Sequence, residues 1–138
     1  MTWLHWALLS ALFAGITAVL AKAGTKNIDP NLAMAIRTAV VLVLAWGIVL
    51  AAGTPKWQTL TGKATLFLCL SGLATGLSWL CYFRALHLGE ASSVAPIDKL
   101  SVVFAIALAA IFLGEQLVWQ HWVGGGLIVA GAILFALK

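Results

Sequence analysis

The sequence has little charge and few polar residues. Only 9% of its 138 residues are charged and 63% are hydrophobic, whereas an average soluble domain is roughly 25% charged and about 45–50% apolar. So few polar residues could not cover the surface of a soluble globular protein. Intrinsic disorder is excluded on the same ground, because disordered chains are charge-rich and apolar-poor. The composition therefore predicts an integral membrane protein.

Acidic residues are the scarcest charged group. Four Asp and Glu stand against eight Lys and Arg, which gives a formal net charge of +4. The cations form no run or patch of the kind that binds nucleic acid. They are scattered one or two at a time between apolar segments, as in the loops of membrane proteins. No nucleic-acid partner is therefore expected.

Groups that carry enzyme chemistry are also few. The two cysteines, Cys69 and Cys81, lie in one apolar segment and are interpreted as packing residues, not as a disulfide or a metal site. The histidines lie in or near predicted loops without metal-ligand spacing: His5, His87 and His121. The sequence has no nucleophile–base pair and no phosphate-binding glycine loop. We therefore expect no enzyme activity, no cofactor and no metal.

Long apolar segments are what the sequence has instead. A helix needs about 20 apolar residues to cross a hydrocarbon core of roughly 30 Å. Strands of a β-barrel are excluded, because residues 40–50 and 102–113 are continuously apolar and barrel strands alternate. We predict an all-α integral membrane protein with five transmembrane helices. The expected spans are residues 3–21, 31–52, 64–83, 92–113 and 120–137.

Five spans place the two termini on opposite sides of the membrane. The amino-terminal side then carries two cations, and the other side four, or five if Arg37 snorkels to it: Lys56 and Lys63, against Lys22, Lys26, Arg84 and Lys138. Because loops rich in Lys and Arg stay cytoplasmic, this distribution favours an external amino terminus. The difference is small, so insertion in both orientations is compatible with it.

The stretch from Tyr82 to Leu117 carries a family resemblance. It reads YFRALHLGEASSVAPIDKLSVVFAIALAAIFLGEQL. The aromatic-x-x-Ala-Leu start, the Ala-Ser-x-x-Ala-Pro turn and the closing Leu-Gly-Glu resemble the signature half of the EamA domain of the drug/metabolite transporter superfamily. The glycine-rich residues 124–131 fit the fifth helix of that domain. Since one EamA unit has about five helices, the resemblance implies a single EamA domain over residues 1–138.

The resemblance implies secondary transport of small metabolites or drugs, with export as the expected direction. The protein would be a multi-pass protein of the cytoplasmic (inner) membrane, in contact with lipid and a small-molecule substrate. Most members of the family carry two units in tandem with inverted topology, whereas this chain has one. A single unit cannot enclose a two-walled pathway, so a homodimer is expected. The alternative is a non-transporting or hetero-paired membrane subunit.

Three charged residues fall inside predicted spans: Arg37, Asp98 and Lys99. Arg37 lies six residues into the second span and Asp98 six into the fourth, and both spans start from the same side. At about 1.5 Å per residue, both side chains lie roughly 9 Å below that interface. We expect them to pair if the two spans are neighbours. Lys99 follows Asp98 at about 100° around the helix, so it is expected to point elsewhere.

Structural interpretations of these charges stay open. If the fourth span begins at Pro96, Asp98 is a first-turn carboxylate that the helix dipole favours, and Lys99 reaches the interface along its aliphatic stem. Arg37 would likewise anchor its helix by reaching the interface along its aliphatic stem. If the helix begins at Ser92 instead and continues through Pro96, the Ser92 carbonyl loses its partner and the span kinks beside a cavity.

Several further residues are candidates for the wall of a substrate cavity. Trp46 and Trp79 lie deeper in their spans than the other tryptophans, although lipid contact or core packing is an alternative for each. Ser78 and Tyr82 are four residues apart and share a helix face. The candidate cavity residues are Arg37, Trp46, Ser78, Trp79, Tyr82, Asp98 and Lys99.

The fifth span carries a candidate dimer interface. Gly124, Leu127, Ile128 and Gly131 resemble the helix-pairing motif of the small multidrug resistance proteins, and small residues let helices approach closely in lipid. We expect an antiparallel homodimer joined through this face. The first span lacks the embedded glutamate of those proteins, which makes their proton-coupling mechanism doubtful here. Asp98 is the remaining carboxylate inside a span.

Overall fold

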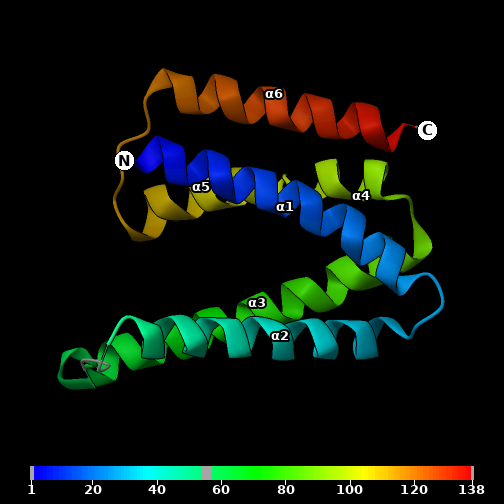
Figure 1. Ribbon diagram of the computed structural model, residues 1–138. Coiled ribbons are helices and arrows are strands. Elements are labelled where there is room, and N and C mark those ends of the chain that lie inside the picture. Colours follow the sequence, from blue (N-terminus) through cyan, green and yellow to red (C-terminus); the bar gives the residue numbers. More distant parts are fainter. Residues whose placement is uncertain (1, 54–56, 138) are drawn as a thin grey trace. The chain divides into compact units, whose positions relative to one another are not determined.

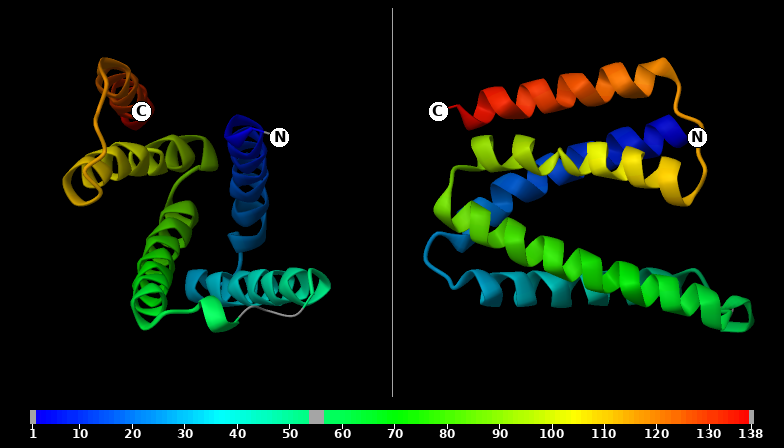
Figure 2. Two further views of the ribbon diagram at one scale, coloured as in Figure 1. Left: turned by 90° about the vertical axis from the view of Figure 1, so that its left-hand side faces the viewer. Right: turned by 180° about the vertical axis from the view of Figure 1, so that it is seen from behind.

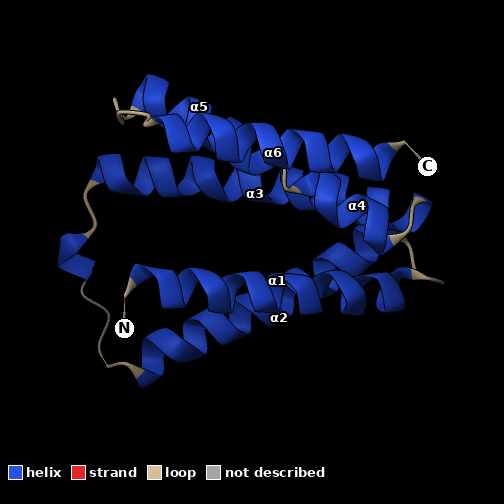
Figure 3. Ribbon diagram, turned by 90° about the horizontal axis from the view of Figure 1, so that it is seen from above, coloured by secondary structure: helices blue, strands red, loops and turns tan. Residues whose placement is uncertain are grey.

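The computed structural model describes residues 2–53 and 57–137. All regular structure in these residues is helical, without strands (Figures 1 and 3). The elements are α1 (Trp3–Thr25), α2 (Pro30–Ala51), the 3-10 turn η1 (Trp57–Thr59), α3 (Gly62–Leu88), α4 (Ala91–Asp98), α5 (Ser101–Phe112) and α6 (Trp119–Ala136). Five stretches are long and apolar enough to cross a membrane: α1, α2, α3, Ala91–Phe112 and α6. The predicted all-helical, five-span fold class is confirmed.

The helices group into two compact units. The first unit comprises residues 1–22 and 88–138, and it contains most of α1 together with α4, α5 and α6. The second unit comprises residues 23–87 and contains α2 and α3. Within it these two helices run antiparallel, because the chain reverses direction between Ala51 and Gly62 (Figure 1).

Apolar side chains cover the outside of both units. Leu73 and Leu77 on α3, for example, are 66% and 67% exposed, and Val43 on α2 is 73% exposed. Buried side chains are few among the described residues, with Phe83 and Leu86 the largest apolar ones. Burying apolar area is what stabilises a protein in water. A chain that leaves this much of it exposed requires lipid or another protein around its helices.

Helix α2 begins where the sequence provides a strong start signal. The Asp29 carboxylate accepts hydrogen bonds from the amides of Asn31 at 2.9 Å and Leu32 at 3.1 Å. These are amides at the helix start that have no partner inside the helix. Pro30 takes the first helical position, where a missing amide hydrogen costs nothing. Asp29 is therefore committed to capping.

Helices α1 and α6 begin with a shared pattern, Trp-x-His-Trp. The Nδ1 atom of His5 accepts from the Thr2 amide at 3.3 Å, and Nδ1 of His121 accepts from the Val118 amide at the same distance. Each imidazole satisfies an amide just before its helix, as a glutamate does in a capping box. These two histidines therefore act as caps, a role that the sequence interpretation did not assign to them.

Helix α6 packs against α4 and α5 within the first unit (Figures 1 and 2). Gly125 is buried there, and a Cβ atom added to it would lie 4.0 Å from Cγ2 of Val103 on α5. Ala132, two turns further along α6, is only 4% exposed. Small residues on one face of α6 thus let it approach α4 and α5 closely.

The stretch predicted as the fourth span is broken in the middle. Helix α4 starts at Ala91 and passes through Pro96, so a helix start at Pro96 is wrong and the alternative through Pro96 is confirmed. The amides of Lys99 and Leu100 bond three residues back, to Pro96 at 3.1 Å and Ile97 at 3.0 Å. Proline has no amide hydrogen for the carbonyl of Ser92. Separately from this missing bond, the helix tightens after Asp98 and restarts as α5 at Ser101.

The end of α5 follows from the Leu-Gly-Glu sequence. Gly114 has a φ of +67°, a left-handed conformation that glycine adopts without a Cβ clash. Its place after the last turn of α5 lets the chain leave the helix toward α6. This segment of the family pattern therefore acts as a helix stop.

Candidate functional site

The best-defined polar arrangement lies between α2 and α3 in the second unit. The guanidinium carbon of Arg37 is 4.4 Å from the ring centroid of Trp79 and 5.5 Å from that of Phe83. The two rings are four residues apart on α3 and so share one face. A cation over an aromatic face is attracted by the ring quadrupole. We call Arg37, Trp79 and Phe83 the guanidinium cluster.

The three residues of the guanidinium cluster are buried to different degrees. Phe83 is 2% exposed, while Arg37 and Trp79 are half-buried. Tyr82, next in sequence to Phe83, has its ring centroid 6.4 Å from that of Phe83 in an edge-on arrangement. Arg37 and Trp79 were predicted as cavity residues, and the structure brings them together. Phe83 was missed, because its spacing of four residues from Trp79 indicates a shared helix face but not that Arg37 lies against that face.

The other predicted cavity residues of this unit lie elsewhere or at the edge. Trp46, near the end of α2, has its ring centroid 6.1 Å from that of Trp57 in η1. It lies nine residues beyond Arg37, or about 13 Å along the helix axis. Ser78 is exposed beside Trp79. The structure thus assigns Trp46 to a second aromatic pair instead of the guanidinium cluster.

Asp98 and Lys99 form an ion pair at the break between α4 and α5. Nζ of Lys99 lies 3.4 Å from Oδ2 of Asp98, with side chains 55% and 36% exposed. The expectation that Lys99 points away from Asp98 is therefore wrong. That expectation considered only the direction in which each side chain leaves the backbone, whereas the long, flexible lysine side chain reaches back to the carboxylate of its neighbour. An exposed pair of this kind contributes at most about 1 kcal/mol.

The predicted pairing of Arg37 with Asp98 joins residues of different units. Within its own unit, each has another partner: aromatic rings for Arg37 and Lys99 for Asp98. The direct Arg37–Asp98 pair stays a prediction.

The predicted dimer face of α6 is next to the face that packs internally. Leu127 is 68% exposed, and Gly124, Ile128 and Gly131 are half-buried. A Cβ atom added at Gly124 or Gly131 would meet nothing within 4 Å. Within the first unit, therefore, no other helix packs closely against these two glycines.

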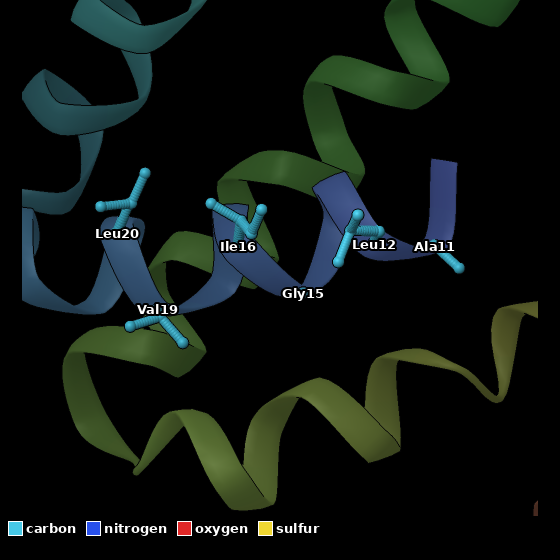
Figure 4. Close-up of a pocket in the computed structure, with 6 residues that line it drawn as sticks. All are labelled: Ala11, Leu12, Gly15, Ile16, Val19 and Leu20. Atoms are coloured by element: carbon cyan, nitrogen blue, oxygen red, sulfur yellow. The ribbon is translucent and has the colours of Figure 1, made fainter. Parts of the chain in front are cut away.

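An apolar groove runs along α1 in the first unit (Figure 4). It has a volume of about 570 Å³ and is lined by Ala11, Leu12, Gly15, Ile16, Val19 and Leu20. All six come from one helix and none carries a polar side-chain atom, so the groove offers shape without hydrogen-bond recognition.

Metal chemistry finds no support in the described part of the chain. It contains no group of three or more His, Cys, Asp or Glu side chains placed to hold an ion. Cys69 and Cys81 are free thiols. The guanidinium cluster and the broken helix are two polar features of the described residues that could act on a small molecule.

These features define a multi-pass membrane protein with an arginine between two of its helices. The chain belongs to the EamA-like transporter family, whose model matches residues 1–137. It is 51% identical over 139 residues to an uncharacterised transporter in the cobO 3' region of a Sinorhizobium species, covering 99% of this chain and 97% of the relative. An uncharacterised protein MJ1333.1 of Methanocaldococcus jannaschii is 29% identical over 76 residues, about half of each chain. No solved structure matches the sequence significantly. The predicted family is confirmed, and the protein is a membrane transporter.

Proposed function

We propose that this protein is a secondary transporter that exports small metabolites or drugs across the cytoplasmic (inner) membrane. The observation that carries the proposal is the guanidinium cluster, a cation held on aromatic rings between two membrane-length helices. A charged side chain inside a span is costly and lines a polar pathway in many transporters. Transport, and no enzymatic reaction, is the activity that this arrangement supports.

The proposed working form is an antiparallel homodimer of two single EamA units. Each chain would cross the membrane five times, so its termini would lie on opposite sides. Two oppositely inserted copies would then reproduce the inverted pair of units of tandem family members. The glycines of α6 support contact through Gly124, Leu127, Ile128 and Gly131, because lipid provides no hydrophobic drive and close packing must do so.

The broken helix is a second element of the proposal. Discontinuous membrane helices expose backbone groups beside ion and substrate sites. Asp98 ends α4 at the break, and it is the proposed proton- or cation-responsive group. Lys99, Ser78, Tyr82 and Trp46 are proposed as further residues of the pathway wall.

Reconstitution tests the proposal directly. The purified protein, alone in liposomes, is assayed for uptake and efflux of a panel of anionic, neutral and cationic metabolites and drugs. We expect saturable movement of at least one class, absent from protein-free liposomes. If transport requires a second membrane protein, the hetero-paired subunit is the correct function. Absence of movement under both conditions would contradict a transporter.

A further inference from the structure

The environment of Arg37 specifies what its substrate must carry. Arg37 lies seven residues after the start of α2, about 10 Å along the helix axis. Its guanidinium has five N–H donors and no acceptor. The rings of Trp79 and Phe83 contact its face, but ring faces do not replace hydrogen-bond acceptors for donors at its edge. Among the described residues of its unit, none accepts a hydrogen bond from this side chain.

Charge in the second unit is strongly one-sided. Residues 23–87 contain five of the eight cations and a single acid: Lys26, Arg37, Lys56, Lys63 and Arg84, against Asp29. Asp29 is occupied with the amides at the start of α2. The remaining residues have three cations and three acids. The whole net charge of +4 therefore belongs to the unit that holds the guanidinium cluster, and such a field attracts anions.

The geometry of guanidinium selects the kind of anion. Its planar fork matches a carboxylate or a phosphate with two parallel hydrogen bonds, and this match is lost with a lysine. The aromatic rings beside it offer an apolar surface to the body of an organic molecule. Charge, donors and rings together fit a small organic oxyanion.

We propose that Arg37 recognises an oxyanion group, a carboxylate or a phosphate, on the transported molecule, with Trp79 and Phe83 orienting the guanidinium. This inference rests on the proposed transport function and adds the substrate class. The phosphate of a lipid headgroup has the same chemistry, so the test separates a soluble anion from a lipid.

Binding is measured by calorimetry on the full chain in phosphatidylcholine nanodiscs, with benzoate, inorganic phosphate and the neutral isostere benzamide as probes. At least one anion is expected to bind, and benzamide is not. Arg37→Gln should weaken that binding roughly 10- to 100-fold, the effect of losing hydrogen bonds to a charged group. Arg84→Gln removes the same charge from exposed α3 surface and should change binding less than about twofold, a surface effect.

Two further variants keep the result interpretable if Arg37→Gln does not fold. Arg37→Lys keeps the charge without the fork and should weaken binding about tenfold. Trp79→Leu keeps the guanidinium without its ring and should weaken binding several-fold. Equal anion binding by wild type, Arg37→Lys and Trp79→Leu would overturn the inference. So would an absence of anion binding in nanodiscs, with Arg37→Gln changing only thermal stability, because the occupant is then lipid.

The transport panel separates this inference from the proposed function. Arg37-dependent binding of an anion without any transport would support oxyanion recognition by Arg37 and contradict the proposed transport function. Transport of neutral or cationic compounds only, unchanged by Arg37→Lys, would support the function and overturn the inference.

Discussion

Arg37 is the one charged residue of α2. Its ring partners stabilise the positive charge but leave N–H donors for another group. The carboxylate of Asp98 and a substrate oxyanion are two candidates for those donors, and they would compete for them. Substrate binding would then depend on whether Asp98 is paired with Arg37.

A double-mutant cycle tests the predicted Arg37–Asp98 pair. If the two residues pair, Arg37→Met and Asp98→Leu should each lower the free energy of unfolding by roughly 1–3 kcal/mol, because each removes one partner and leaves the other charge without it. The double variant should lose less than the sum of the two, measured by unfolding in detergent. A parallel cycle of Asp98→Leu with Lys99→Met serves as control, with an expected coupling below about 1 kcal/mol. Additive effects for Arg37 and Asp98 would remove their pairing.

Helix α4 and helix α5 together cross the membrane as two short helices with a turn between them. The turn lies three residues after Pro96, at Lys99 and Leu100. The side chains of Asp98 and Lys99 meet beside this turn. They form a polar point inside a stretch that is otherwise apolar.

Replacing Pro96 should repair this break at the expense of function. Pro96→Ala supplies an amide for the Ser92 carbonyl and should raise the free energy of unfolding by about 1–3 kcal/mol. We expect transport in liposomes to slow, because the polar turn is lost. Pro30→Ala is the matched control, since proline is favourable at the first helical position and its loss should not stabilise. A Pro96→Ala variant that is no more stable and transports normally would contradict a role for the break.

Elements were far easier to predict from sequence than contacts were. The five apolar runs fixed the number and type of helices, because membrane crossing demands a minimum apolar length. The two possible starts of α4 fit the local sequence equally well, so only the structure distinguishes them. Arg37 and Trp79 were both predicted as residues of one cavity, which anticipated their contact. The contact of Arg37 with Phe83 depends on how α2 lies against α3, and the sequence alone does not give that arrangement. The caps by His5 and His121 went unassigned because histidine is not a usual capping residue.

At the scale of the whole molecule, one chain leaves most of its large apolar side chains exposed. Helix α6 uses one face for α4 and α5 and has small residues on the adjacent face. That second face is where a further helix could approach without displacing anything in the unit. The proposed pair of chains would use this face.

The dimer face predicts a specific pattern of glycine variants. Gly131→Leu should shift the protein toward monomer in detergent, because a bulky side chain blocks close helix approach. Its own fold should tolerate the change, since a Cβ atom there meets nothing within 4 Å. Gly126→Leu is the control: its Cβ atom also meets nothing within 4 Å, and it lies on the opposite side of α6 from Gly131. Equal monomer fractions for the two variants by size-exclusion light scattering would contradict this interface.

Two covalent fusions test most directly whether two oppositely inserted copies form one transport pathway. Joining two copies end to end by a short linker forces them into opposite orientations, because the proposed five crossings place the two ends of each copy on opposite sides of the membrane. Adding one extra transmembrane helix to the linker forces them into the same orientation. In liposomes, with the compound that the unfused protein moves best, the direct fusion should transport at a comparable rate and the extra-helix fusion should not. Equal transport by the extra-helix fusion, or none by the direct fusion, would contradict the account.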